Sequence, residues 1–578
     1  MSATAEARIR RHLLATVVLT SLLIVPGLPD PSNAPKEWLL VPCAAALAVE
    51  AVWLARLRPL RDWAPVAAAG LVVMGLAVAA IINTQQVYRT LYGVWGRADG
   101  LLTYVAFMVA FAVGSQVFRG QGLRAVETMA GLTAVETVLS IVQRAANAPL
   151  YVAKPYNPIM GTFSNPDFAS AFLGIGSVAL LHVAADRRRS SRLRAAAGVF
   201  SVAAVMLSIL SDSLQGPLCA IIGVAVMGLI AIFDDACPLP LRWLRVWAPV
   251  AVAVVILSGI GAIFGRGPLR EVLASGNLAD RFYCWRAAIG MWRHSPVTGI
   301  GLDSYGDWYG VTRGPELLGG GAANPSTAAH SVPLQLLATG GLVVFVPYVL
   351  LLVFVAARAV KALRSGRDRG TLAALLGMWL AHVAQSMFSL DQLGIGIWGW
   401  VFAAAIVAHP LTDPPAAEDP NRHLGADGVT RGEGLAVSVA FLTACVLIAV
   451  PVQAHLSYLS ESTAIDQAVA SQRAASPGLA ASAAMREPVL ALAMILQLRE
   501  AGFATTGLDI ARSGAQRFPR DSQIAAQAAD IAESRGDFRG ALPYRVRSVA
   551  LEPRLVAYAA QLAIDRSKAG VVTSAATS

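Results

Sequence analysis

Charged residues are scarce in this chain: Asp, Glu, Lys and Arg make up only 14% of its 578 residues, whereas hydrophobic residues make up 56%. This composition excludes an ordinary soluble protein and predicts membrane-spanning helices, each of about twenty mostly apolar residues. The net charge is +10, but the basic residues lie mainly in short segments between apolar runs. Membrane topology explains this excess better than nucleic-acid binding does, so no nucleic-acid partner is expected.

Cysteine and the common catalytic motifs are equally scarce. The five cysteines show no paired spacing, so they imply neither a disulfide framework nor a metal site (Cys43, Cys219, Cys237, Cys284 and Cys445). There is no Asp-x-Asp pair, no HExxH motif, no Walker loop and no nucleotide-binding glycine fingerprint. We therefore expect no metal, no cofactor and no ATP site.

Long apolar runs are abundant, and they predict an all-α, polytopic membrane protein. About twelve form a transmembrane domain over residues 1–410, and one further span follows it. The predicted spans cover residues 13–28, 38–55, 64–82, 101–118, 126–143, 168–185, 195–211, 217–233, 247–264, 333–355, 371–388, 395–409 and 434–453.

Positive charge orients these spans. With the N-terminus in the cytoplasm, the segments on that side hold 22 Lys and Arg residues, and the short loops on the other side hold 5. This asymmetry follows the positive-inside rule. It places a large loop over residues 265–332, and everything after residue 453, outside the cytoplasm.

The connection after the transmembrane domain is rich in proline and charge. Residues 411–433 predict a disordered cytoplasmic linker, and the extra span at residues 434–453 then carries the chain back out.

The C-terminal residues 454–578 are Ala-rich and helical in pattern. Gly502 and Gly536 are 34 residues apart, and so are Pro519 and Pro553. This period is typical of tetratricopeptide helix–turn–helix repeats, which present concave surfaces to protein partners. An unrelated helical hairpin is the alternative.

The large loop over residues 265–332 interrupts the apolar pattern, and long loops in a compact domain usually carry function. Its amphipathic run over residues 280–293 predicts an interfacial helix on which Arg281 and Trp285, four residues apart, share a face. Arg281 could bind the phosphate of a lipid-linked substrate bidentately. Anchoring among lipid headgroups is the alternative, and it explains Arg286 at least as well.

His330 lies where the large loop re-enters the membrane. A histidine there can take a proton from an attacking hydroxyl, because its ordinary pKa lies near neutral pH. Capping of the following span is an equally good interpretation.

Three further polar residues lie at outer ends of spans. Arg97 is a candidate second phosphate ligand, although Asp99 could simply pair with it. Asn165 precedes Pro166, which is a helix-start signal with a purely structural explanation. Gln215 lies in a connection too tight for a solvated loop, so we expect it to face a cavity or the outer rim.

Four stretches occur in a characteristic order. They are Arg97-Ala-Asp-Gly100, Gly161-Thr-Phe-Ser-Asn-Pro-Asp167, Arg281-x-x-x-Trp285 with Pro296-x-x-Gly299-x-Gly301, and Ala329-His330-Ser331-x-x-Leu334-Gln335 with Gly340-Gly341. Over about residues 10–410 this order resembles the O-antigen ligase and polymerase family of bacterial membrane glycosyltransferases. Two departures stand out: the family's Ser-Arg pair is here Ser213-Leu-Gln215, and Ser331 replaces an asparagine.

The resemblance implies metal-independent, inverting transfer of a glycan from an undecaprenyl-diphosphate carrier, at the outer face of the bacterial plasma membrane. Arg281 would hold the diphosphate, Arg97, Arg286, Asn165, Gln215 and Trp285 would help to bind the substrate, and His330 would activate the acceptor. The acceptor is a glycan, a lipid or a protein, so ligase, polymerase and protein O-oligosaccharyltransferase all stay open. The competing classes are a flippase or transporter of lipid-linked sugars and a scaffold that recruits partners through its repeats.

Overall fold

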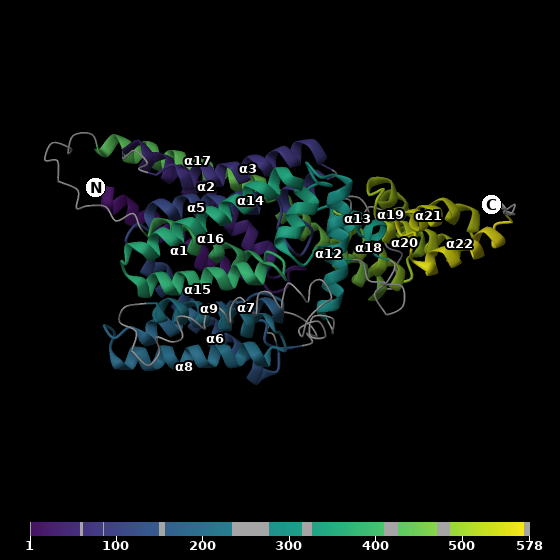
Figure 1. The fold of residues 1–578 in the computed structure, drawn as a ribbon. Coiled ribbons are helices and arrows are strands. Elements are labelled where there is room, and N and C mark those ends of the chain that lie inside the picture. Colours follow the sequence, from purple (N-terminus) through teal and green to yellow (C-terminus); the bar gives the residue numbers. More distant parts are fainter. Residues whose placement is uncertain are drawn as a thin grey trace.

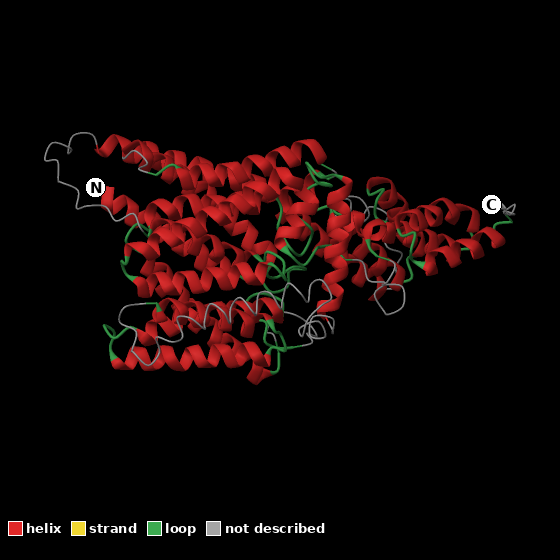
Figure 2. Cartoon of the chain, in the orientation of Figure 1, coloured by secondary structure: helices red, strands yellow, loops and turns green. Residues whose placement is uncertain are grey.

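The computed structural model describes residues 2–57, 62–84, 86–148, 157–233, 277–314, 326–409, 426–470 and 486–570. These ranges are helical and contain no strand, which confirms the all-α prediction (Figure 2). The predicted span at residues 247–264, and most of the predicted linker, lie outside the described residues.

Seven described helices are long and apolar enough to cross a membrane, so the chain is a polytopic membrane protein. They are α3 (Ala64–Asn83), α6 (Gly122–Ala146), α7 (Pro166–Ala185), α8 (Ser191–Leu210), α9 (Gln215–Ile232), α14 (Val332–Ser365) and α17 (Ala426–Ala470). Two apolar helices are shorter, α5 (Leu101–Val117) and α16 (Leu393–Ala408). Three more occupy predicted spans: α1 (Ser2–Leu22), α2 (Asn33–Leu57) and α15 (Arg369–Ser386). A core of twelve transmembrane helices stays a prediction.

Helix α16 lies at the centre of the bundle (Figure 1). All its residues are buried, and it packs against α1, α5, α14 and α15. Its sequence contains only apolar residues and glycine, so it has no polar face to turn toward water. Helix α1 differs from its predicted span, because it ends at Leu22, ahead of Pro26 and Gly27, where a helix is disfavoured.

Three of the described helices cover one end of the bundle, which we call the outer end. They are α4 (Val87–Tyr92), α12 (Asn277–His294) and α13 (Tyr305–Thr312). The predicted amphipathic run forms α12. Its buried face packs against α13 and the start of α14, through Cys284, Ala287, Ala288 and Met291.

The extra span is longer than the apolar pattern indicates. Helix α17 begins at Ala426, inside the predicted linker, and continues past residue 453 to Ala470 while packing along α2. Its His455 stacks on Trp95 of the outer loops, with ring centroids 3.6 Å apart. One continuous helix therefore connects the membrane domain to the C-terminal domain.

The C-terminal domain repeats its geometry every 34 residues. Helices α18 (Pro488–Glu500), α20 (Ser522–Ser534) and α22 (Val556–Lys568) begin at residues 488, 522 and 556. Helices α19 (Ala504–Arg517) and α21 (Phe538–Leu551) keep the same offset. Gly502, Gly536 and Gly570, also at intervals of 34, have φ angles of 83°, 79° and 69°, a conformation that glycine adopts without strain. The helix–turn–helix period is present, and its assignment to tetratricopeptide repeats stays a prediction.

This domain docks onto α13. Arg313, which follows α13, forms an ion pair of 2.7 Å with Glu552 at the end of α21, and their side chains are only 2% and 8% exposed. Arg520 lies 4.0 Å from the centroid of the Trp308 ring. Gly310 packs against α21 so closely that a Cβ would clash with Glu552. The repeats are therefore built onto the outer end of the bundle.

We expect Glu552→Ala to loosen the docked C-terminal domain, because it leaves Arg313 charged and buried without its carboxylate. Losing one partner of a buried pair costs about 3–5 kcal/mol. Limited proteolysis and thermal unfolding would measure the change. The matched control is Arg512→Ala, since Arg512 and Asp537 pair at 3.4 Å with 39% and 49% exposure and should contribute little. Equal effects of the two substitutions would contradict the docking role.

Candidate active site

The outer end brings together loops that are far apart in the sequence. Helix α7 begins as the Asn165-Pro166 pair predicts, because the Asn165 side chain caps it and accepts a hydrogen bond from the Asp167 backbone nitrogen at 2.8 Å. The cap places the Asp167 carboxylate at the first turn of α7, where it approaches α12.

Arg281 on α12 meets that carboxylate. Its Nη2 lies 3.5 Å from Asp167 Oδ2, and its Nη1 donates to the backbone carbonyl of Phe388 at 2.6 Å. The Trp285 ring lies 5.7 Å from the Phe388 ring, so Arg281 and Trp285 do share a helix face. Because Asp167 is 30% exposed and the ion pair is long, the positive charge of Arg281 is only partly neutralised within the protein.

His330 lies next to this pair in a constrained loop. Its φ angle of 49° is left-handed, which costs a residue with a side chain about 1–3 kcal/mol. Two neighbours hold this shape: the Ala329 backbone nitrogen donates to Gln335 Oε1 at 2.8 Å, and Trp285 Nε1 approaches the His330 carbonyl at 3.5 Å. These contacts therefore hold the backbone at His330.

The electrostatic surroundings keep His330 neutral. Burial, and then the positive charges of Arg281 and Arg97, lower the pKa of His330 to about 4. A neutral imidazole has a nitrogen lone pair that can accept a hydrogen bond or a proton. The structure thus brings three predicted residues, His330, Arg281 and Arg97, within electrostatic range of one another.

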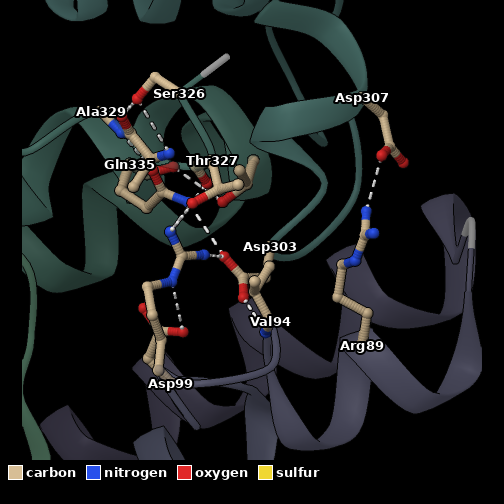
Figure 3. A network of polar contacts seen from close by, with 12 residues as sticks. Arg89, Val94, Asp99, Asp303, Asp307, Ser326, Thr327, Ala329 and Gln335 are labelled. Carbon is tan, nitrogen blue, oxygen red and sulfur yellow. Dashed lines mark hydrogen bonds and ion pairs between the residues drawn. The ribbon is translucent and has the colours of Figure 1, made fainter. Parts of the chain in front are cut away.

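Arg97 is the centre of a second network, whose members Asp99, Asp303, Thr327 and Gln335 are labelled in Figure 3. Its guanidinium forms an ion pair with Asp303, lies 3.3 Å from Asp99 and donates to the Thr327 carbonyl at 2.8 Å. Asp303 also accepts from Gln335 Nε2 at 3.2 Å. This network links the second outer loop, the large loop and the start of α14.

The same network balances the charge of Arg97. Burial lowers the pKa of Arg97, but the neighbouring carboxylates of Asp303 and Asp99 outweigh burial and leave that pKa raised. With two carboxylates beside it, Arg97 lacks the spare positive charge that a phosphate ligand needs. Its role as a second phosphate ligand stays a prediction, in which a phosphate would replace a carboxylate.

Two other predicted residues have different surroundings. Gln215 is buried at the start of α9, where its Oε1 accepts from Gln385 Nε2 at 3.2 Å. Arg286 is exposed on α12. Their roles in substrate binding stay predictions.

Sequence reasoning missed the residues that hold the site in shape. Asp303 closely follows the Gly299-x-Gly301 turn. A buried arginine needs carboxylate partners, but no local sequence pattern indicates that Asp303 is the partner of Arg97. Phe388 contributes a backbone carbonyl, which no side-chain pattern can reveal. Among the described residues, no group of three or more His, Cys, Asp or Glu side chains is arranged to hold a metal.

We expect Asp303→Ala to destabilise the outer end, because it leaves Arg97 undercompensated and removes an acceptor of the Val94 backbone nitrogen, 2.6 Å away. The expected cost is about 3–5 kcal/mol, as for other broken buried pairs, and thermal unfolding would measure it. Asp303→Asn should cost less, because it keeps a hydrogen-bond acceptor. The control is Asp509→Ala at an exposed position of α19, and a comparable loss there would refute the assigned role.

Comparison with known proteins bears on this cluster. No curated protein matches the chain. A family model described as O-Antigen ligase matches residues 159–349, a segment that contains Arg281, Asp303, His330 and Gln335. The predicted resemblance is confirmed over this segment, which includes the centre of the candidate site.

Proposed function

We propose that this protein transfers a glycan from an undecaprenyl-diphosphate carrier to an acceptor hydroxyl at the extracytoplasmic face. One observation carries the proposal: a neutral histidine, His330, lies beside Arg281, whose positive charge is only partly neutralised. Both residues lie in the segment that matches the O-antigen ligase model. A proton acceptor beside a cation is what displacement of a diphosphate requires.

Arg281 is the residue we assign to the diphosphate. A guanidinium stays charged in any environment and binds phosphate oxygens in pairs. The diphosphate would take the place of Asp167, whose carboxylate makes only a long contact. As the bond to the sugar breaks, negative charge grows on the leaving oxygen, and Arg281 would stabilise it.

His330 is the residue we assign to the acceptor. The acceptor oxygen attacks the anomeric carbon and forms a new C–O bond, while the bond from that carbon to the diphosphate oxygen breaks. The hydroxyl proton passes to a ring nitrogen of His330, and from there to solvent or to the released diphosphate. A single displacement of this kind inverts the anomeric centre, and no step needs a metal.

The acceptor class decides among ligase, polymerase and protein O-oligosaccharyltransferase. A purified-protein assay would use synthetic undecaprenyl-diphosphate sugar with EDTA present. Lipid A core, a second lipid-linked unit and a peptide would be offered separately as acceptors. Transfer to one of them names the reaction, whereas carrier binding without any transfer would favour a flippase or a scaffold.

We expect Arg281→Ala and His330→Ala to differ in this assay, because only Arg281→Ala should weaken carrier binding as well as turnover. Arg281→Ala should lower turnover by about 10²–10³-fold and also weaken carrier binding. His330→Ala should leave carrier binding nearly unchanged and lower turnover by about 10²–10⁴-fold. Arg293→Ala, an exposed arginine on the same helix, is the control for general loss of charge. Parallel loss of binding and turnover in His330→Ala would indicate a structural role instead.

The pH dependence tests the neutral state of His330. With its pKa lowered to about 4, the imidazole stays unprotonated from pH 7.5 down to about 5, so kcat/KM should not fall there on its account. Folding should show the linked effect: an unfolded histidine binds its proton near pH 6.5, so this residue destabilises the fold as pH falls from there toward 4. A pH–rate profile with an acid limb near 6.5 would contradict the assignment.

A further inference from the structure

Two adjoining cavities lie at the end of the bundle opposite the candidate site. Their volumes are about 520 and 640 Å³, and Leu123, Asp368 and Thr371 line both. Helices α7 and α14 run along the bundle from the end that holds the site (Figure 1). Ala185, the last residue of α7, and Gly366, the C-cap of α14, line the larger cavity. Since α7 has 20 residues, the two ends are about 30 Å apart, one hydrocarbon thickness.

Positive charge dominates the cavity walls. Six arginines line them, against three acidic residues: Arg124, Arg187, Arg188, Arg189, Arg367 and Arg369, and Glu127, Asp186 and Asp368. The acidic residues are engaged within the protein. Arg189 pairs with both Glu127 and Asp186, and Asp368 caps α15 by accepting from the Thr371 backbone nitrogen. The walls therefore carry an excess of positive charge.

One wall of the larger cavity is apolar and leads into the lipid-facing side of the bundle. Met227, Ile230 and Ala231 of α9 line it. Val224, seven residues before Ala231 and on the same helix face, is exposed, and Ile221 continues the exposed stripe. A ligand here meets arginines at one end and hydrocarbon-compatible side chains at the other.

We propose that the larger cavity binds an anionic phospholipid of the leaflet opposite the candidate site. The phosphodiester would lie against Arg187 and Arg188, and an acyl chain would follow the Ala231–Ile221 face of α9. Basic pockets between transmembrane helices bind such headgroups. The apolar wall favours a lipid over free phosphate, which shares the same anionic chemistry. This lipid cannot be the glycan carrier of the candidate site, because a membrane thickness separates the two places.

The test uses the delipidated full-length protein in detergent and native mass spectrometry with phosphatidylglycerol or phosphatidylcholine. We expect phosphatidylglycerol to bind several-fold more tightly. Arg187→Gln with Arg188→Gln should weaken it by about five-fold for each arginine removed. The matched control is Arg192→Gln with Arg364→Gln, which removes equal charge from exposed positions at the same end, outside both cavities.

Three results would overturn the proposal. Equal affinity for the two lipids would remove the anionic preference, and equal weakening in the control variant would reduce it to general surface charge. Displacement of phosphatidylglycerol by millimolar inorganic phosphate would show that the cavity holds a free anion. Unchanged thermal unfolding of the variants in lipid-free detergent would establish that the changes in binding are not caused by misfolding.

Discussion

A buried guanidinium needs carboxylates beside it wherever water is excluded, and the outer end of this protein is organised around that need. Arg97 takes Asp303 and Asp99 as partners. Asp303 also accepts a hydrogen bond from the Gln335 side chain, and Gln335 in turn accepts one from the Ala329 backbone nitrogen, next to His330. The strained φ angle of the histidine is therefore maintained by a chain of polar contacts that begins at one arginine.

The two arginines nearest His330 differ in how much of their positive charge is neutralised within the protein. Arg97 is compensated and organises the loops, whereas Arg281 contacts a backbone carbonyl and one distant carboxylate. Gln215 lies in the segment Ser213-Leu-Gln215, which departs from the expected Ser-Arg pair, and it is hydrogen-bonded to Gln385, three residues before Phe388. The neutral amide pair supports the segment that holds Arg281 and adds no charge to the site.

The sequence alone could predict what depends on periodicity and composition. The apolar runs indicate the long helices, the four-residue spacing puts Arg281 and Trp285 on one face, and the 34-residue spacing of Gly502 and Gly536 marks the repeat. It could not predict contacts between distant segments, such as Arg97 with Asp303, 206 residues apart. It also could not predict that Phe388 would act through its carbonyl, because any residue type has one.

The docked C-terminal domain follows from the same constraint that organises Arg97. Arg89, in α4 of the second outer loop, pairs with Asp307 of α13 at 2.8 Å and with Glu487, just before α18, at 3.2 Å. All three side chains are nearly inaccessible, so separating any of them would expose or isolate a charge that now lies out of water. One guanidinium thereby joins the membrane domain, the large loop and the repeats. The repeats consequently hold α13, and the Asp303 turn just before it, in the position that the site requires.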